Sequence, residues 1–304
     1  MTNALLQVLT NQKPAYTPAA PIYLSLFLED FERNYYIEQY RLRIGDEHRY
    51  IIDHDEDTRI RVQALYQSYG IFKNRPNWIE VHCGASRAWA ERTQILQRKG
   101  VLYYHDIASG VEVPMHSIKI PRGDARLHPE NSYHHDLWDT SSNVQDQDAI
   151  DELLSITSAA ELIKDGHFDL PKQVVADYGT RYFISTVLDT PYSDTYDLLG
   201  FQGLMIIQND RPELFHYLLK RRLALSEQIM TAWASTGIHG VFVEEVFTGA
   251  DMISPTNYDK FVFAYNQPYF QTMCRLGLIP ILRLRRCIAA PGSDLQSGYC
   301  CCGG

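Results

Sequence analysis

The stretch from Gly237 to Pro255, GIHGVFVEEVFTGADMISP, constrains the fold of this chain more than any other segment. Its short apolar run, Val241 to Val243, ends in the two carboxylates Glu244 and Glu245. A glycine-containing loop follows, and a Ser-Pro pair then opens a helical pattern. An apolar strand, an acidic tip and a capped helix are typical of a β/α barrel, because such barrels carry their catalytic groups at the carboxyl ends of the strands.

Length and composition limit the class of protein. A chain of 304 residues can form one large α/β domain or two smaller ones. The net charge of −9 argues against a nucleic-acid-binding protein. No apolar run approaches the roughly 20 residues that span a bilayer. The N-terminus lacks the basic start and apolar core of a secretory signal, and the cysteines show no recurring disulfide spacing. We therefore expect a cytoplasmic protein without a membrane segment.

Several strand patterns alternate with helix patterns. The predicted strands are Ile22–Phe27, Trp78–Cys83, Tyr182–Leu188 and Leu278–Leu282, besides the strand at Val241. The predicted helices are Ala4–Leu9, a segment from Asp30 onward, Asp55–Tyr69, Asp169–Tyr178, Asp210–Trp233 and Pro255–Leu276. Such alternation predicts a parallel sheet with right-handed crossovers. The alternating pattern contains about five strands, whereas a closed barrel has eight.

Two segments depart from this alternation. Residues 101–120 predict a β-hairpin that turns at Ala108-Ser109-Gly110, within an insertion of about residues 85–145. From Arg283 the chain loses all periodicity and ends in CCCGG. We therefore predict one barrel domain over residues 1–282 with an aberrant tail over 283–304, in a chain that is truncated or read out of frame after about Leu282. A mass spectrum of the native protein with this tail as its C-terminus would contradict that hypothesis.

Three segments resemble the uroporphyrinogen decarboxylase superfamily, which also contains the corrinoid-dependent methyltransferases. They are Thr190–Leu219, Gly237–Phe270 and Gly277–Leu282, and the predicted hairpin resembles the superfamily more faintly. The resemblance implies a (β/α)8 TIM barrel whose mouth holds a tetrapyrrole, a corrinoid or a methylated small molecule. The decarboxylases carry an arginine-rich loop near the first strand, where this chain reads IYLSLFLEDFER. The methyltransferases bind zinc through a His-x-Cys where this chain has Arg283-Leu284-Arg285.

The function that this resemblance implies is corrinoid-dependent methyl transfer, with the corrinoid carried by a partner protein. Uroporphyrinogen III decarboxylation in porphyrin biosynthesis is one alternative, and a non-catalytic barrel fragment or binding module is another. A second copy of the chain is a further candidate partner. We expect no metal site and no cofactor bound through a recognisable motif. An open doubly wound sheet that binds a dinucleotide has no support, because no Gly-x-Gly-x-x-Gly follows a strand.

The candidate catalytic residues lie at two strand ends. Adjacent strand residues point to opposite faces, so only one of Glu244 and Glu245 can face into the barrel. The resemblance favours Glu245 as a general acid or base with a raised pKa, and a capping or solvated carboxylate is an equal alternative. Asp189 is a second catalytic candidate, with a helix N-cap as its alternative role. Tyr192 and Tyr196 are substrate-binding candidates, and Tyr196 could equally belong to the core.

Further substrate-binding candidates lie in the first half of the chain. Glu80 and His82 alternate along a predicted strand and therefore share a face. They could form a polar pocket wall, and a semi-buried histidine with its polar groups satisfied is the structural alternative. Cys83 beside them does not complete a zinc site, which needs four ligands. Tyr23, on the predicted first strand, is the last candidate. The pair His134-His135 lies in a polar segment that we interpret as a solvated loop.

Overall fold

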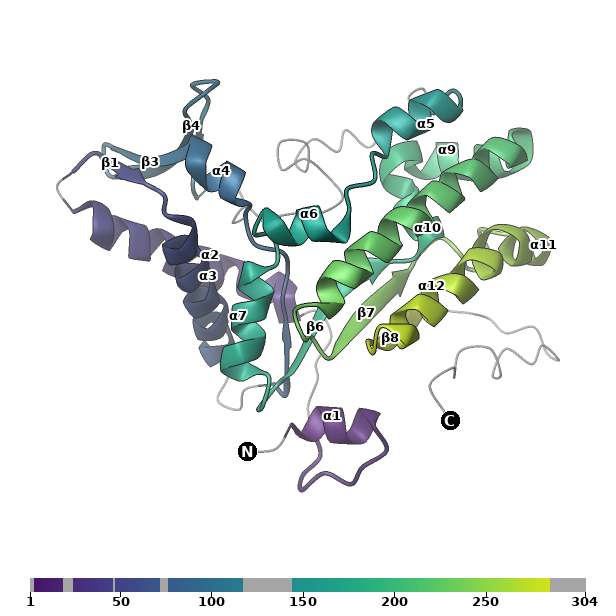
Figure 1. Cartoon of the computed structure of the whole chain (residues 1–304), viewed down its shortest axis with the longest axis horizontal. Coiled ribbons are helices and arrows are strands. Elements are labelled where there is room, and N and C mark those ends of the chain that lie inside the picture. The colour runs from purple at the N-terminus through teal and green to yellow at the C-terminus, as the bar shows by residue number, and fades with distance from the viewer. Residues whose placement is uncertain (1–2, 19–23, 46, 72–75, 117–143, 285–304) are drawn as a thin grey trace. The chain divides into compact units, whose positions relative to one another are not determined.

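The computed structural model describes residues 3–18, 24–45, 47–71, 76–116 and 144–284 (Figure 1). The chain divides into two compact units. Unit 1 comprises Met1–Glu130, Ala160–Ser185 and Thr236–Ile238. Unit 2 comprises Asn131–Ala159, Thr186–Ser235 and His239–Gly304. Each unit is a contiguous body built from segments that are far apart in the sequence, so neither can be cut out as one stretch of chain.

Unit 1 is built on helices that the sequence predicted in large part. They are α1 (Ala4–Leu9), α2 (Leu24–Ile44), α3 (His54–Ser68), the short 3-10 helix η1 (Tyr69–Ile71), α4 (Arg87–Arg92), α6 (Ala159–Lys164) and α7 (Asp169–Tyr178). Asn3 caps α1 and Asp53 caps α3, each by accepting a hydrogen bond from a backbone N–H of the first turn.

The predicted strand Ile22–Phe27 is wrong, because α2 already begins at Leu24. Leu28, Glu32, Tyr36 and Tyr40 are all buried and recur every four residues, as one stripe of a helix does. The helical pattern therefore extends towards the N-terminus into an apolar run that is too short to be told from a strand by periodicity. Ile22 and the candidate Tyr23 lie outside the described residues.

An antiparallel sheet covers the helices of unit 1. Its strands are β1 (Arg49–Ile51), β3 (Thr93–Arg98), β4 (Val101–Asp106) and β5 (Glu112–Pro114), in the order β1-β3-β4-β5. The predicted hairpin is confirmed: the Asp106 carboxylate accepts hydrogen bonds from the backbone of Ala108 and Ser109, and Gly110 has φ of +72°. Strands β1 and β3 were not predicted.

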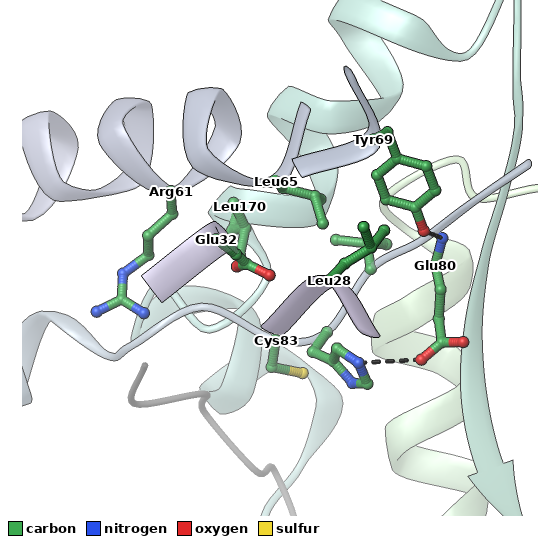
Figure 2. A pocket seen from close by; sticks show the side chains of 10 residues that line it. Leu28, Glu32, Arg61, Leu65, Tyr69, Glu80, Cys83 and Leu170 are labelled. Carbon is green, nitrogen blue, oxygen red and sulfur yellow. Dashed lines mark hydrogen bonds and ion pairs between the residues drawn. The ribbon is translucent and has the colours of Figure 1, made fainter. Parts of the chain in front are cut away.

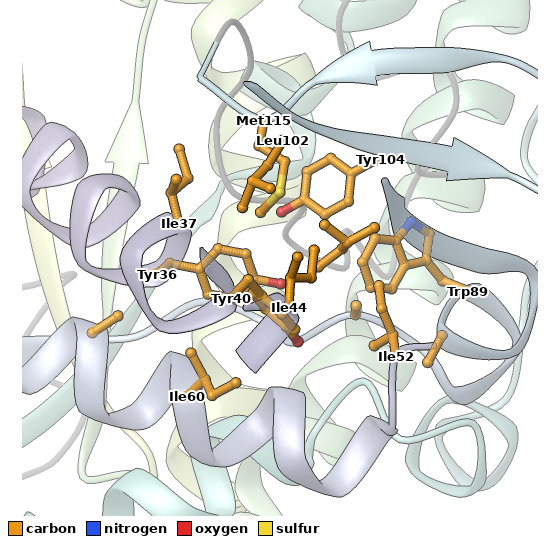
Figure 3. Packing of buried hydrophobic residues seen from close by; sticks show 14 residues of the cluster. Tyr36, Ile37, Tyr40, Ile44, Ile52, Ile60, Trp89, Leu102, Tyr104 and Met115 are labelled. Carbon is orange, nitrogen blue, oxygen red and sulfur yellow. The ribbon is translucent and has the colours of Figure 1, made fainter. Parts of the chain in front are cut away.

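The core of unit 1 lies between this sheet and helices α2 and α3. Figure 3 shows Tyr36, Tyr40 and Ile60 of the helices facing Leu102 and Tyr104 of β4. Within this apolar cluster Asp57 accepts hydrogen bonds from the hydroxyls of both Tyr36, at 2.5 Å, and Tyr40, at 2.6 Å. Arg61 pairs with the same carboxylate, so the buried charge is fully surrounded by donors.

Four parallel strands follow one another in the order β2-β6-β7-β8. In unit 1, β2 (Trp78–Glu80) pairs with the first residues of β6 (Phe183–Asp189), Trp78 opposite Phe183. In unit 2, β7 (Gly240–Glu245) pairs with β8 (Ile279–Leu284), Gly240 opposite Ile279. The predicted α/β fold with a parallel sheet is confirmed, whereas no closed barrel is present among the described residues. Strand β8 ends at Leu284, two residues beyond the end of the strand predicted at Leu278–Leu282, and the predicted tail stays a prediction.

Helices of unit 2 pack on its strands. They are α5 (Gln147–Leu153), α8 (Pro191–Asp194), α9 (Tyr196–Asp210), α10 (Pro212–Ala234), α11 (Pro255–Asn257), the π-helix η3 (Tyr258–Phe263) and α12 (Ala264–Arg275). Proline opens α8, α10 and α11, where its missing N–H costs nothing. The long helices α10 and α12 lie side by side (Figure 1). The helices predicted at Asp210–Trp233 and Pro255–Leu276 are thereby confirmed in outline.

Candidate functional site

Glu245, at the end of β7, is a buried carboxylate with three hydrogen-bond donors. Its side chain is 1% exposed. Thr248 Oγ1 donates to Glu245 Oε1 at 3.0 Å, and the hydroxyl of Tyr258 donates to the same oxygen at 3.3 Å. The Asn266 amide donates to Glu245 Oε2. Since Tyr258 belongs to η3 and Asn266 to α12, Glu245 points towards the helices of unit 2.

Burial raises the pKa of Glu245, and the hydrogen bonds from Thr248, Asn266 and Tyr258 oppose that shift. The raised pKa agrees in direction with the expectation for a general acid or base. Its cause is burial on the helix side rather than a neighbouring carboxylate in an open mouth. The catalytic role of Glu245 stays a prediction, and the geometry assigns the side chain an anchoring role.

Glu244 lies on the opposite face of the strand, because adjacent strand residues alternate. It is partly exposed, whereas the side chains of Val241 and Val243 on the face of Glu245 are fully buried. The carbonyl of Glu244 accepts a hydrogen bond from the N–H of Thr190 at 3.2 Å. This bond brings the carboxyl end of β6 next to that of β7, so the two acidic strand tips are neighbours.

Asp189 ends β6, and it does not cap the helix that follows. The cap of α8 is Thr190, whose side chain accepts from the N–H of Ser193 at 3.4 Å. The alternative role of Asp189 as an N-cap is therefore wrong. The carbonyl of Asp189 accepts a hydrogen bond from Tyr269 at 3.0 Å, which fixes the strand tip against α12. The carboxylate itself is partly exposed beside Glu244.

Tyr192 belongs to the core of unit 2. It is fully buried, and its ring packs edge-on against Phe215 with centroids 5.9 Å apart. Burial raises the pKa of Tyr192 to about 12, while Gln208 acts in the opposite direction and Glu245 adds to the rise. The phenol therefore stays protonated at neutral pH. A substrate that contacted Tyr192 would have to enter the core.

Tyr196 stacks on the loop that follows β7. Its ring lies 4.6 Å from that of Phe247 at an interplanar angle of 22°, and Phe247 in turn contacts Phe201 at 5.6 Å. Phe247 has φ of +63°, a left-handed conformation that is costly for a bulky residue and is held here by packing. The three rings form an aromatic cluster beside the strand ends of unit 2.

A groove in unit 2 lies next to this aromatic cluster. It has a volume of about 510 Å³. Its lining residues come from α9 and from the segment that joins β7 to α11: Phe201, Met205, Gln208, Asn209, Asp251, Met252, Ile253, Ser254 and Asn257. Because this segment starts at the carboxyl end of β7, the groove occupies the position at which α/β folds carry their ligands.

Glu80 and His82 line a separate cavity in unit 1 (Figure 2). Glu80 Oε1 and His82 Nε2 are 3.1 Å apart, and the N–H of Glu80 donates to the hydroxyl of Tyr69 at 3.0 Å. Arg61 and Cys83 also border the cavity. Its volume is about 20 Å³, which holds one water molecule and no organic substrate. The substrate-binding role of Glu80 and His82 stays a prediction.

The remaining candidates give no metal centre. In the part of the chain that the structure describes, no three His, Cys, Asp or Glu side chains converge as metal ligands would. His134 and His135 lie outside the described residues, as does Tyr23. The expectation that no metal binds was based on motifs, and it stays a prediction.

Several polar residues around the strand ends were missed by the sequence. They include the partners of Glu245, which are Thr248, Tyr258 and Asn266, and the amides of the groove, which are Gln208, Asn209 and Asn257. They also include the almost fully buried ion pair of Arg222 and Asp194, whose Nη1 and Oδ2 atoms are 2.8 Å apart. The one available signal was a charge on an apolar helix face. Arg222 follows Leu218 and Leu219 and precedes Leu225, so its position could have predicted burial.

Comparisons with known proteins show that the fold of this chain is similar to that of a solved structure. No protein-family model matches the chain, and no curated protein matches it either. A methyltransferase from Methanosarcina mazei has a similar structure, with a TM-score of 0.51 at 13% sequence identity. The match covers 93% of this chain and 69% of that protein. At this identity the likeness shows a shared α/β architecture and no more.

No helix among the described residues is both long and apolar enough to cross a membrane.

Proposed function

We propose that this chain is a methyltransferase whose parallel sheet belongs to a (β/α)8 barrel of the uroporphyrinogen decarboxylase type. The observation that carries the proposal is the likeness in fold to the methyltransferase from Methanosarcina mazei over 93% of the chain. Two features of unit 2 support it. The acidic tips of β6 and β7 are adjacent, and the segment that follows β7 lines a groove of small-molecule size.

In this proposal a corrinoid on a partner protein carries the methyl group. Phe201, which contacts Phe247 of the aromatic cluster, is 45% exposed and offers apolar surface to a macrocycle that is presented from outside. The groove itself suits a small molecule, since its volume of about 510 Å³ lies in the usual range for such ligands. The residues present therefore fit a corrinoid at the rim and the second substrate in the groove.

The chain contributes positioning and proton transfer. Asp189 is the best-placed base, because its carboxylate is partly exposed at a strand tip whose carbonyl is fixed by Tyr269. A base at this position can take the proton from a protonated acceptor before the acceptor receives the methyl group.

The proposal is tested by methyl transfer from methylcobalamin, followed by the change in the absorbance of the corrinoid. We expect Asp189→Asn to lower the rate by roughly 10² to 10⁴, the usual contribution of a general base. The matched control is Asp259→Asn, which removes an exposed aspartate of the same unit that lies outside the groove. Equal rates for both variants would overturn the role of Asp189. An inactive wild-type protein would overturn the proposed function.

Uroporphyrinogen decarboxylation is less well supported. A polycarboxylate needs cations for binding, and none of the described residues that line the groove is Lys or Arg. The same preparation should therefore release no CO2 from uroporphyrinogen III.

A further inference from the structure

The hydroxyl of Ser193 joins the short helix after β6 to the chain that leaves β7. The backbone N–H of Val246 donates to Ser193 Oγ at 2.8 Å, and the hydroxyl donates to the carbonyl of the same Val246 at 3.4 Å. The hydroxyl of Thr190 donates to Ser193 Oγ at 3.0 Å. The serine oxygen therefore uses its one donor and both of its acceptor positions.

This contact continues the linkage between the two strands beyond their ends. Strand β6 ends at Asp189, and the N–H of Thr190 donates to the carbonyl of Glu244 at 3.2 Å. Ser193 then bonds Val246, two residues farther along the chain than Glu244, in place of a backbone partner on a neighbouring strand. Ser193 is 4% exposed, so water does not readily replace it as the acceptor. The tips of β6 and β7 are therefore held together by two successive links, the second of which depends on a side chain.

Helix α8 gives Ser193 a fixed position. All four residues of α8 are buried. Asp194, on one side of Ser193, forms the buried ion pair with Arg222 of α10. Tyr192, on the other side, packs against Phe215 of the same helix. A side chain between two such anchors has little freedom to move with the chain after β7, so it is a fixed point to which that chain is attached.

The link also fixes the start of the segment that lines the groove. Val246 directly precedes Phe247, whose φ of +63° is costly for an aromatic residue. The same segment supplies residues 251–254 to the lining of the groove. The position of this wall relative to Asp189 therefore depends on where Val246 is held.

We propose that Ser193 is a positioning residue, whose hydroxyl holds the chain after β7 in a fixed place relative to Asp189. The inference rests on the proposed function in one respect, since it takes Asp189 as the base in methyl transfer. Ser193 gives no proton to a substrate, because its own donor is engaged by Val246. It acts through the geometry between the base and a ligand in the groove, where a displacement of about 1 Å can slow a reaction by roughly 10².

The link itself is tested by amide hydrogen exchange on the full chain, resolved to single residues by NMR. We expect the Val246 amide to exchange about tenfold faster in Ser193→Ala than in the wild type, because it loses its acceptor. The amide of Val243, inside β7, should exchange at an unchanged rate. Unchanged exchange at Val246 would overturn the proposal. An equal rise at both amides would also overturn it, since that result reports general destabilisation.

The effect on the reaction is tested by methyl transfer from methylcobalamin. We expect Ser193→Ala to lower kcat by roughly 10² and to change the KM for methylcobalamin less than about threefold, because a misplaced base affects the transition state rather than binding. Ser193→Cys fills the same space with a weakly hydrogen-bonding thiol. It should show both effects, in exchange and in rate, even where the alanine variant folds poorly.

The matched control is Ser226→Ala. It removes a buried hydroxyl of the same unit that donates to the carbonyl of Arg222 within α10, and it should leave the exchange of Val246 and the rate unchanged. Faster exchange at Val246 with an unchanged kcat in both Ser193 variants would overturn the positioning role.

The two proposals fail in different ways. Methyl transfer that is unaffected by the Ser193 variants would overturn the positioning role and leave the proposed function standing. Faster exchange confined to Val246, in a protein that transfers no methyl group, would support the link between the strand tips and overturn the proposed function.

Discussion

The side chain of Glu245 joins three segments of unit 2. It accepts hydrogen bonds from Thr248 in the loop after β7, from Tyr258 in η3 and from Asn266 in α12. A buried carboxylate is costly unless its charged form is hydrogen-bonded, and here burial still raises the pKa above the ordinary value of 4.5. The folded protein therefore holds this proton more tightly than the unfolded chain does.

That difference in proton affinity predicts a pH dependence of stability. The contribution of a carboxyl with a raised pKa is full below pH 4.5 and is lost as the pH rises through the folded-state pKa. Glu245→Gln keeps the shape and cannot titrate. We expect the unfolding free energy of the wild type minus that of Glu245→Gln, measured by urea unfolding, to fall as the pH rises. A difference for Glu245 that rises with pH would contradict the account.

The ion pair between Arg222 and Asp194 predicts a large loss of stability when one partner is removed. The two side chains are 1% and 4% exposed, so a lone Asp194 carboxylate would be left buried without its cation. We expect Arg222→Met to cost roughly 3 to 5 kcal/mol of unfolding free energy. Adding Asp194→Leu should recover part of that loss, because the unpaired charge is then gone. A cost below about 1 kcal/mol for the single variant, the usual value for an exposed pair, would contradict it.

The orientation of Glu245 shows where sequence reasoning at the residue scale ends. Strand alternation predicted that Glu244 and Glu245 face opposite sides, which agrees with their burial. Alternation does not predict which face of β7 contacts the helices. Glu245 lies on that face because it accepts hydrogen bonds from Tyr258 and Asn266. These contacts depend on how η3 and α12 pack on the strand, which the local sequence pattern does not predict. The sequence could therefore predict the pair of carboxylates and not the role of each.

At the scale of elements, local chemistry made some segments predictable and left others ambiguous. The hairpin of β4 and β5 followed from its turn residues, and α10 followed from a proline in its first turn. The apolar run before Asp30 was ambiguous because six residues suit a strand or a buried helical turn equally. Strand β3 was missed because its partners β1 and β4, rather than its own pattern, make it a strand.

Helix α9 predicts the effect of one backbone substitution. Gly200, inside this helix, has φ of +62° and ψ of 176°, a conformation that is essentially restricted to glycine. The kink immediately precedes Phe201, so it also sets the position of one groove wall. We expect Gly200→Ala to lower the unfolding free energy by roughly 1 to 3 kcal/mol in thermal or urea denaturation. The exposed neighbour variant Gln202→Ala should not destabilise the helix, and an equal loss in both would contradict this role for Gly200.

At the scale of the whole molecule, the chain forms two compact units, each assembled from three separate stretches of the sequence. Strand β6 begins in unit 1 and ends in unit 2, and residues 236–238 return to unit 1 before β7 starts. The length of the chain alone is compatible with one domain or two. The division into two units depends on contacts between residues that are far apart in the sequence. The single barrel domain over residues 1–282 stays a prediction, as does the (β/α)8 architecture of the proposed enzyme.

The central claim concerns the chemistry of the acidic strand ends and of the groove in unit 2. It is tested most directly by following a deuterium-labelled methyl group from methylcobalamin into a panel of amines and thiols, with the purified full chain and mass spectrometry of the products. The account predicts labelled product from the wild-type protein and strongly reduced labelling with Asp189→Asn. The absence of labelled product with the wild type, or equal labelling by wild type and Asp189→Asn, would contradict it.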